Sequence, residues 1–294
     1  MFDKILLPLD GSEASESALP YGEELAKRLG SEMILYHVHR REDEDRKRMQ
    51  EVYLESLAGR LQADFEDSEA KVSMEIGAGE PTESICNLVE KSGIGLLVMT
   101  AVSASGLKVG RMLGSVTDQV CRTVPIPVLL VRPQGKPMAG ASDRLLTRML
   151  VSLDGSQLSQ LALPVAGELA AKLKISMTLF QMANMVRIMD DGSGAAPYVD
   201  YAGLNDTEKR RVAAEMEKIE KSLKEKGLDV TTVVTSGFDA ALDIMEVSKK
   251  VSADLVVMST HGRTGLGRWV FGNVAEKVVR YGQTPVLLVH SSAR

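Results

Sequence analysis

Short apolar runs alternate with longer amphipathic stretches along this chain. The runs KILLPL, MILYHV, GLLVMT and PVLLV in the first half are rich in valine, leucine and isoleucine. Uninterrupted apolar runs of this length are typical of parallel strands that are buried on both faces. The stretches between them are long enough to form helices that cross from one strand to the next. The pattern therefore predicts an α/β fold in which βαβ units surround a parallel sheet.

Local sequence signals predict where some of the helices begin and end. Ser12 or Ser15 is a suitable N-cap for a helix that ends before Gly30. In the second half, Asn205 followed by Glu208 has the spacing of a capping box, which predicts a helix start there.

The second half of the chain repeats the first. ILLPLDGSEASESALPYGEELAKRLG from Ile5 matches MLVSLDGSQLSQLALPVAGELAAKLK from Met149, a shift of 144 positions. Near the ends the shift is 158, because VPIPVLLV ending at Val131 matches GQTPVLLV ending at Val289. The second copy therefore holds about 14 additional residues, and residues 183–203, which have loop composition, are where we place them.

A linker separates the two copies. The 294 residues are about twice the most common domain length, and RPQGKPMAGASDR between the copies is rich in proline, glycine and small polar residues. We place the boundary near Gly140 and expect two domains, residues 1–140 and residues 141–294.

Composition narrows the class of function. A net charge of −5 does not provide the basic surface that nucleic-acid binding needs. Cys86 and Cys121 lack the spacing of a zinc or redox motif. The uncharged run between Lys4 and Asp10 is too short for the core of a secretory signal, and the longest uncharged run, residues 92–107, is too short and too rich in glycine and serine for a membrane span. We therefore expect a cytoplasmic protein with no metal site, no nucleic-acid partner and no membrane partner.

The segment MSTHGRTGLGRWVFGNVAEKVV, which begins at Met258, has the composition of a phosphate-binding loop. It follows an apolar strand and precedes an amphipathic stretch. Glycines let the backbone approach an anion, and a helix N-terminus adds partial positive charge. His261 and Arg263 add donors, although a glycine-rich turn without a ligand is the alternative interpretation. The loop matches neither the Walker motif nor GxGxxG.

An aspartate follows the first strand of each copy, in LDGSEAS at Asp10 and in LDGSQLS at Asp154. Ligands of open α/β sheets bind outside the carboxyl ends of the strands, and a carboxylate there suits a ribose hydroxyl. The alternative interpretation is that each aspartate only caps the helix that follows it.

Taken together, the LDGSEAS opening, the HV pair that ends at Val38, the MSTHGRTGL…GN loop and the closing PVLLV resemble the universal stress protein family over nearly the whole chain. The resemblance implies two tandem Rossmann-like domains, each an open five-stranded parallel sheet with helices on both faces. One branch of the family binds ATP through Gly-x-x-Gly, nine residues, then Gly followed by Ser or Thr. Here Ser259 replaces the first glycine and Asn273 replaces the final hydroxyl residue, whereas Gly262 and Gly272 remain.

The resemblance implies a nucleotide site in the second copy. Asp154 would contact the ribose or adenine, the backbone near Met182 and Met258 would border the base, and the loop and the helix start would hold the phosphates. The full set comprises Asp154, Met182, Met258, Ser259, His261, Gly262, Arg263, Gly272, Asn273 and Val274.

The first copy departs further from the family motif. Val102 stands where the second copy has His261, and Ser103 stands where it has Gly262. We therefore expect a weaker, degenerate site in the first copy, formed by Asp10, Val38, Met99, Gly114 and Ser115.

The leading hypothesis is a nucleotide-binding regulatory protein that signals stress or energy state. ATP, or AMP or ADP in its place, is the expected cofactor, with Mg²⁺ as an additional candidate. A weak ATPase or phosphotransfer enzyme and a nucleotide-independent interaction scaffold are the alternatives. Family members often pair through their last strands, which here implies an intrachain pseudo-dimer of the two domains. A homodimer stays open as a further alternative. We also expect a protein partner, whose identity the sequence does not give.

Overall fold

The computed structural model describes residues 1–39, 44–66, 68–102, 113–133, 144–185, 201–260 and 272–290. The first half contains β1 (Lys4–Pro8), α1 (Glu13–Glu16), α2 (Leu19–Leu29), β2 (Glu32–His39), α3 (Glu44–Ala63), β3 (Lys71–Ala78), α4 (Pro81–Ser92), β4 (Leu96–Thr100), α5 (Ser115–Thr123) and β5 (Val128–Val131).

The second half repeats this order with β6 (Arg148–Leu153), α6 (Gln157–Gln160), α7 (Ala162–Leu173), β7 (Ser176–Asn184), α8 (Tyr201–Glu225), β8 (Val230–Gly237), α9 (Ala240–Lys250), β9 (Leu255–Ser259), α10 (Asn273–Tyr281) and β10 (Val286–Val289). No helix among these described residues is long and apolar enough to cross a bilayer.

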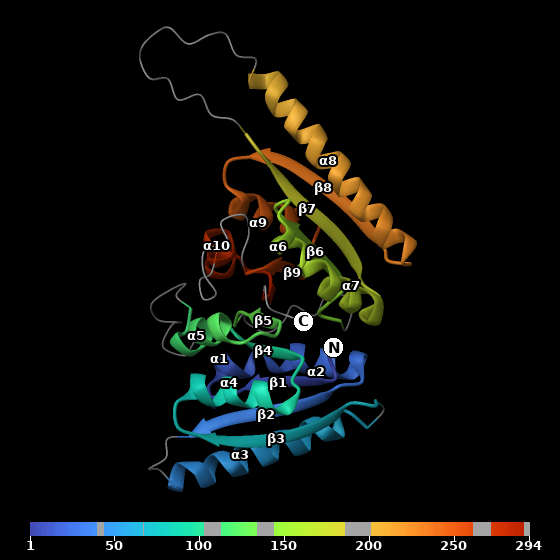
Figure 1. Cartoon of the computed structure of the whole chain (residues 1–294). Coiled ribbons are helices and arrows are strands. Elements are labelled where there is room, and N and C mark those ends of the chain that lie inside the picture. The colour runs from blue at the N-terminus through green and yellow to red at the C-terminus, as the bar shows by residue number, and fades with distance from the viewer. Residues whose placement is uncertain are drawn as a thin grey trace, which may run out of the picture.

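One ten-stranded sheet runs through both halves, in the order β3-β2-β1-β4-β5-β10-β9-β6-β7-β8. Strands pair in parallel within each half, and the predicted α/β fold is confirmed. Figure 1 shows the halves one above the other, with α3 and α8 at opposite ends. The predicted intrachain pseudo-dimer is also confirmed, because β5 and β10 pair antiparallel, with Leu129 opposite Leu287.

Helices cover both faces of the sheet. Along a strand, successive side chains point to opposite faces. Leu35 of β2 packs in one buried cluster with Leu25 of α2 and Leu54 of α3, whereas its neighbour Ile34 packs in a second cluster with Ile85 of α4. The strands are therefore buried on both sides, which explains their uninterrupted apolar sequences.

Contacts between the halves follow the sequence repeat. The carboxylate of Glu24 accepts a hydrogen bond from the backbone N–H of Leu145, and that of Glu168 accepts one from the amino group of Met1 at 3.2 Å. Glu168 lies 144 positions after Glu24, and Leu145 lies 144 positions after Met1. The halves therefore contact each other reciprocally, as the subunits of a symmetric dimer do.

The structure corrects one predicted helix start and divides another helix. Asn205 lies inside α8, which already includes Tyr201, and Thr207 Oγ1 donates to the carbonyl of Gly203 at 2.7 Å across that first turn. The capping-box prediction is therefore wrong. Ser12 caps the short α1 instead of one long helix, whereas the predicted end before Gly30 is confirmed by its left-handed φ of 67°.

The additional residues of the second copy fall partly in regular structure. Strand β7 extends to Asn184 and helix α8 begins at Tyr201, so both ends of the predicted 183–203 loop belong to these elements. Residues 186–200, and residues 134–143 around the proposed boundary at Gly140, lie outside the described residues. The division into residues 1–140 and 141–294 stays a prediction.

Candidate functional site

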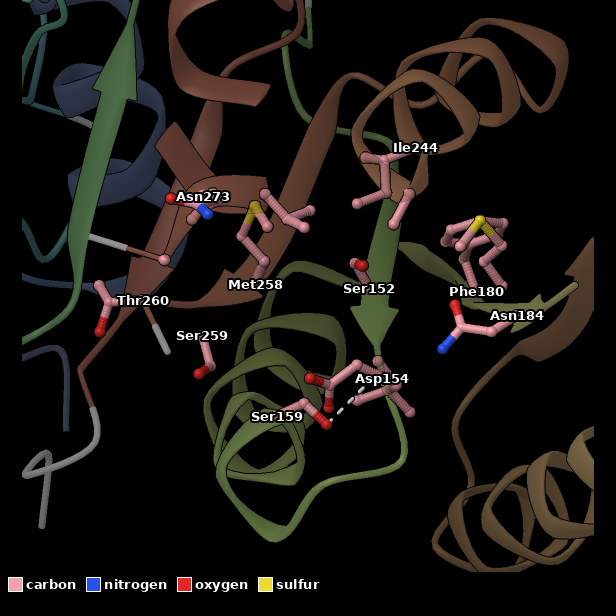
Figure 2. Close-up of a pocket in the computed structure, with 16 residues that line it drawn as sticks. Ser152, Asp154, Ser159, Phe180, Asn184, Ile244, Met258, Ser259, Thr260 and Asn273 are labelled. Atoms are coloured by element: carbon pink, nitrogen blue, oxygen red, sulfur yellow. Dashed lines mark hydrogen bonds between the residues drawn. The ribbon is translucent and has the colours of Figure 1, made fainter. Parts of the chain in front are cut away.

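A cavity of about 320 Å³ opens at the carboxyl ends of β6, β7 and β9 (Figure 2). Strands β6 and β9 are neighbours in the sheet, but the chain continues from β6 toward β7 on one side and from β9 toward β10 on the other. The connections therefore diverge and leave a crevice at this switch point, which is where open α/β sheets bind ligands.

The cavity brings together most of the residues predicted for the second-copy site. Asp154, Met182, Met258, Ser259, Gly272, Asn273 and Val274 line it. The other predicted residues, His261, Gly262 and Arg263, lie outside the described residues. The geometry thus gathers side chains that are far apart in sequence, and their roles toward a ligand stay predictions.

Asp154 follows β6 and forms a tight turn before α6. Its Oδ1 accepts a hydrogen bond from the N–H of Ser156 at 2.9 Å, and its own N–H donates to Ser159 Oγ at 3.3 Å. Ser156 is the residue that caps α6, through a hydrogen bond from the N–H of Ser159 at 3.1 Å. The aspartate is therefore not the N-cap, and its carboxylate is held in place by the turn while it lines the cavity (Figure 2).

Helix α10 presents its N-terminus to the cavity. Gly272 is the N-cap and has ordinary extended backbone (φ −64°). Because it is a glycine, no side chain caps this end of the helix. Its N–H donates to the carbonyl of Thr260 at 2.9 Å. The next three N–H groups, of Asn273, Val274 and Ala275, belong to the first turn and have no intrahelical acceptor. Because the helix dipole adds partial positive charge, this end of the cavity favours an anion.

The opposite end of the cavity is apolar. Phe180 and Met182 of β7 line it together with Ala240 and Ile244 of α9. Phe180 and Ile244 are almost completely buried. A flat apolar group, such as a nucleobase, fits a surface of this composition. Sequence reasoning missed Phe180, Ala240 and Ile244, although a period of two back from Met182 would have found Phe180.

The first half repeats the backbone of this site. Gly114 caps α5 with φ −61°, and its N–H donates to the carbonyl of Ala101 at 3.1 Å, as Gly272 does to Thr260. Ser115 begins α5, Met99 is buried in β4, and Val38 lies near the end of β2.

Asp10 forms the same turn as Asp154. Its Oδ1 accepts hydrogen bonds from the N–H and the hydroxyl of Ser12, at 3.0 and 2.5 Å. Burial acts to raise the pKa of Asp10, but the hydrogen bonds from Ser12 and Ser15 outweigh it and lower this pKa below its usual value. Ser12 caps α1, so Asp10 is not the cap either.

Metal ligands are not clustered in the part of the chain that the structure describes. No group of three or more His, Cys, Asp or Glu side chains stands close enough there to hold a metal ion. Cys86 and Cys121 are not joined in a disulfide, and burial raises the pKa of both thiols.

Known proteins resemble this chain over both halves. The model of the universal stress protein family matches residues 1–132 and 146–290. A universal stress protein of Mycobacterium tuberculosis strain H37Rv is 24% identical over 212 residues, which cover 72% of this chain and 67% of that protein. One of Methanocaldococcus jannaschii is 28% identical over 151 residues, 50% of this chain and 84% of that protein.

Solved structures share the fold. The crystal structure of a universal stress protein from Archaeoglobus fulgidus has a TM-score of 0.73 at 22% identity and covers 98% of both chains. One described as a putative universal stress protein from Pseudomonas aeruginosa has a TM-score of 0.70 at 19% identity, and the match covers 98% of this chain and 93% of that one.

Proposed function

The chain belongs to the universal stress protein family, and on that premise we propose that its second half binds ATP and acts as a regulatory module that responds to stress or energy state. The binding cavity is the one at the carboxyl ends of β6, β7 and β9. The expected ligand is ATP, with AMP or ADP as competitors for the same cavity.

The order of chemical groups along the cavity is the observation that carries this proposal. The N-terminus of α10 stands at one end, Asp154 lies in the middle after β6, and the apolar surface of Phe180, Met182 and Ile244 forms the other end. Phosphates, ribose and base follow each other in that order in a nucleotide. Helix N-termini favour phosphates, carboxylates accept from ribose hydroxyls, and apolar surfaces suit a base.

The described residues that line the cavity fit a nucleotide and do not by themselves form a metal centre. Mg²⁺ that accompanies ATP is bound chiefly by phosphate oxygens and water. The chain would hold the phosphates through the backbone N–H groups of Asn273, Val274 and Ala275 and would leave the metal to the nucleotide. Regulation would follow if an occupied cavity changed the surface that a protein partner contacts.

The test is isothermal titration calorimetry of the full chain with ATP, using the variant Asn273→Asp. A carboxylate at the first position of α10 suits the helix dipole, so the variant should fold, but it places negative charge beside the phosphates. We expect ATP affinity to fall roughly tenfold or more.

The matched control is Ser115→Asp, the same change at the equivalent position of the first half, where α5 begins. We expect it to leave ATP affinity unchanged. If the unmodified chain binds no adenine nucleotide at millimolar concentration, the proposal is wrong. If Ser115→Asp lowers affinity and Asn273→Asp does not, the ligand occupies the first half instead.

A further inference from the structure

Asn184 is the last residue of β7, and its side chain lies on the cavity face of the strand. Side chains two positions apart along a strand share one face. Phe180, Met182 and Asn184 all line the cavity, in agreement with this spacing. Figure 2 shows the carboxamide of Asn184 beside Phe180 and turned toward Asp154. The residue was not among those predicted from the sequence.

The carboxamide of Asn184 brings hydrogen-bonding groups to an otherwise apolar end of the cavity. The neighbouring lining side chains are those of Phe180, Met182, Ala240 and Ile244. Asn184 is exposed, and the described part of the chain offers its side chain no hydrogen-bond partner. Its two donors and its acceptor are therefore available to a ligand.

The position of Asn184 relative to α10 determines which part of a ligand it would meet. In the sheet, β9 and β6 separate β7 from β10, so Asn184 and the start of α10 lie at opposite ends of the cavity. A nucleotide with its phosphates at α10 and its ribose at Asp154 would place its base at Asn184.

We infer that the Asn184 carboxamide recognises the edge of the base and makes the site select adenine over guanine. This inference rests on the proposed nucleotide-binding function. The amide N–H donates to N7 of adenine, and the amide oxygen accepts from the N6 amino group, a bidentate pairing that suits asparagine. Guanine presents two acceptors, O6 and N7, on the same edge, so one of the two hydrogen bonds becomes a repulsion between oxygens.

The repeat provides a contrast for this residue. The equivalent sequence position in the first half, 144 residues earlier, is Arg40, which lies outside the described residues. A guanidinium carries donors only and cannot accept from the adenine amino group. At this sequence position the second half has a side chain that suits adenine, and the first half does not.

The test compares ATP, GTP and 7-deaza-ATP, which lacks the N7 acceptor, by calorimetry on the full chain and on Asn184→Ala. We expect the unmodified chain to bind ATP roughly 5- to 100-fold more tightly than GTP. It should also bind ATP several-fold more tightly than 7-deaza-ATP. In Asn184→Ala both ratios should fall toward one, because the group that distinguishes the bases is gone.

The control is Asn87→Ala, which removes an exposed asparagine from α4 of the first half and should leave both ratios unchanged. The inference is overturned, with the proposed function intact, if ATP binds but Asn184→Ala keeps the ATP-to-GTP ratio of the unmodified chain. It is also overturned if 7-deaza-ATP binds the unmodified chain as tightly as ATP. Absence of binding by every nucleotide would instead overturn the proposed function and this inference with it.

Discussion

The two halves of the molecule share a backbone arrangement and differ in the side chains at the carboxyl ends of their strands. Gly114 and Gly272 have nearly equal φ angles, and each donates its N–H to the residue after the preceding strand, Ala101 in one half and Thr260 in the other. Side chains around that frame have changed. Pro8 of the first half corresponds to Ser152, which lines the cavity in the second half.

This difference shows what each half contributes. The fold depends on buried strands and on the seam between β5 and β10, and both copies supply these equally. Binding chemistry depends on a few side chains at strand ends, which can change without disturbing the core. A half that bound no ligand would still support its partner through the seam and through contacts such as that of Glu24 with Leu145.

The seam should respond equally to the same truncation in either half. Leu129 and Leu287 lie opposite each other in the antiparallel pair and are almost completely buried. We expect Leu129→Ala and Leu287→Ala each to lower the free energy of unfolding by about 2–5 kcal/mol, because each removes buried methyl groups and leaves a cavity. Urea denaturation followed by circular dichroism measures the change.

Leu242→Ala, at a half-exposed position on α9, is the control and should change stability by less than about 1 kcal/mol. If Leu129→Ala were tolerated while Leu287→Ala was not, the halves would not depend on the seam equally. The comparison of two equivalent scaffolds would then be wrong.

The fold could be predicted from the sequence because its signals are local or repeated. Buried strands appear as apolar runs, and the pairing of β5 with β10 followed from the resemblance to a family whose members often pair through their last strands. The wrong helix start at Asn205 shows the limit of such signals. A capping box is only one preference, and the residues before it continue the helix as far back as Tyr201.

The candidate site could be predicted only in part. Asp154, Met258 and Asn273 stand next to recognisable motifs, whereas Ile244 reaches the cavity because α9 packs over β7. Packing between distant elements leaves no signature at a single position. Asn184 follows Met182 by two residues, so the period of a strand would have placed it on the same face. Sequence reasoning missed it because the composition of residues 183–203 predicts a loop, whereas β7 extends to Asn184.

Exchanging one buried residue between the halves should produce a smaller effect than truncating the seam. His37 is buried in β2, and its Nδ1 donates to the carbonyl of Leu9 at 2.7 Å. The repeat places Gln181 at the equivalent position, and its buried Nε2 has no hydrogen-bond partner among the described residues. We expect His37→Gln to lower the free energy of unfolding by about 1–2 kcal/mol, through loss of this hydrogen bond.

The reverse exchange, Gln181→His, should raise the free energy of unfolding by up to about 1 kcal/mol, because an imidazole N–H could reach the carbonyl of Leu153 as it does in the first half. Both variants are compared with the unmodified chain by urea denaturation at pH 8. If Gln181→His lowered the free energy of unfolding, the surroundings of this side chain would differ between the two halves.

The smallest expected effect is on the pH dependence of the free energy of unfolding, and it compares the turn at Asp10 with its counterpart at Asp154. Because hydrogen bonds from Ser12 and Ser15 lower the pKa of Asp10 below its usual value, its ionised form stabilises the folded state. That stability is fully present above the usual carboxyl pKa of about 4 and is lost as the pH falls through the lower folded-state pKa. Since the side chain remains partly exposed to solvent, Asp10→Asn should cost less than about 1 kcal/mol at pH 7. The difference in the free energy of unfolding from the unmodified chain, measured by urea denaturation between pH 7 and pH 3, should shrink toward zero at the acid end.

A difference that stayed constant across this range would mean that the charge of Asp10 does not stabilise the turn. Asp154→Asn, measured in parallel, would show whether the turn in the second half behaves in the same way.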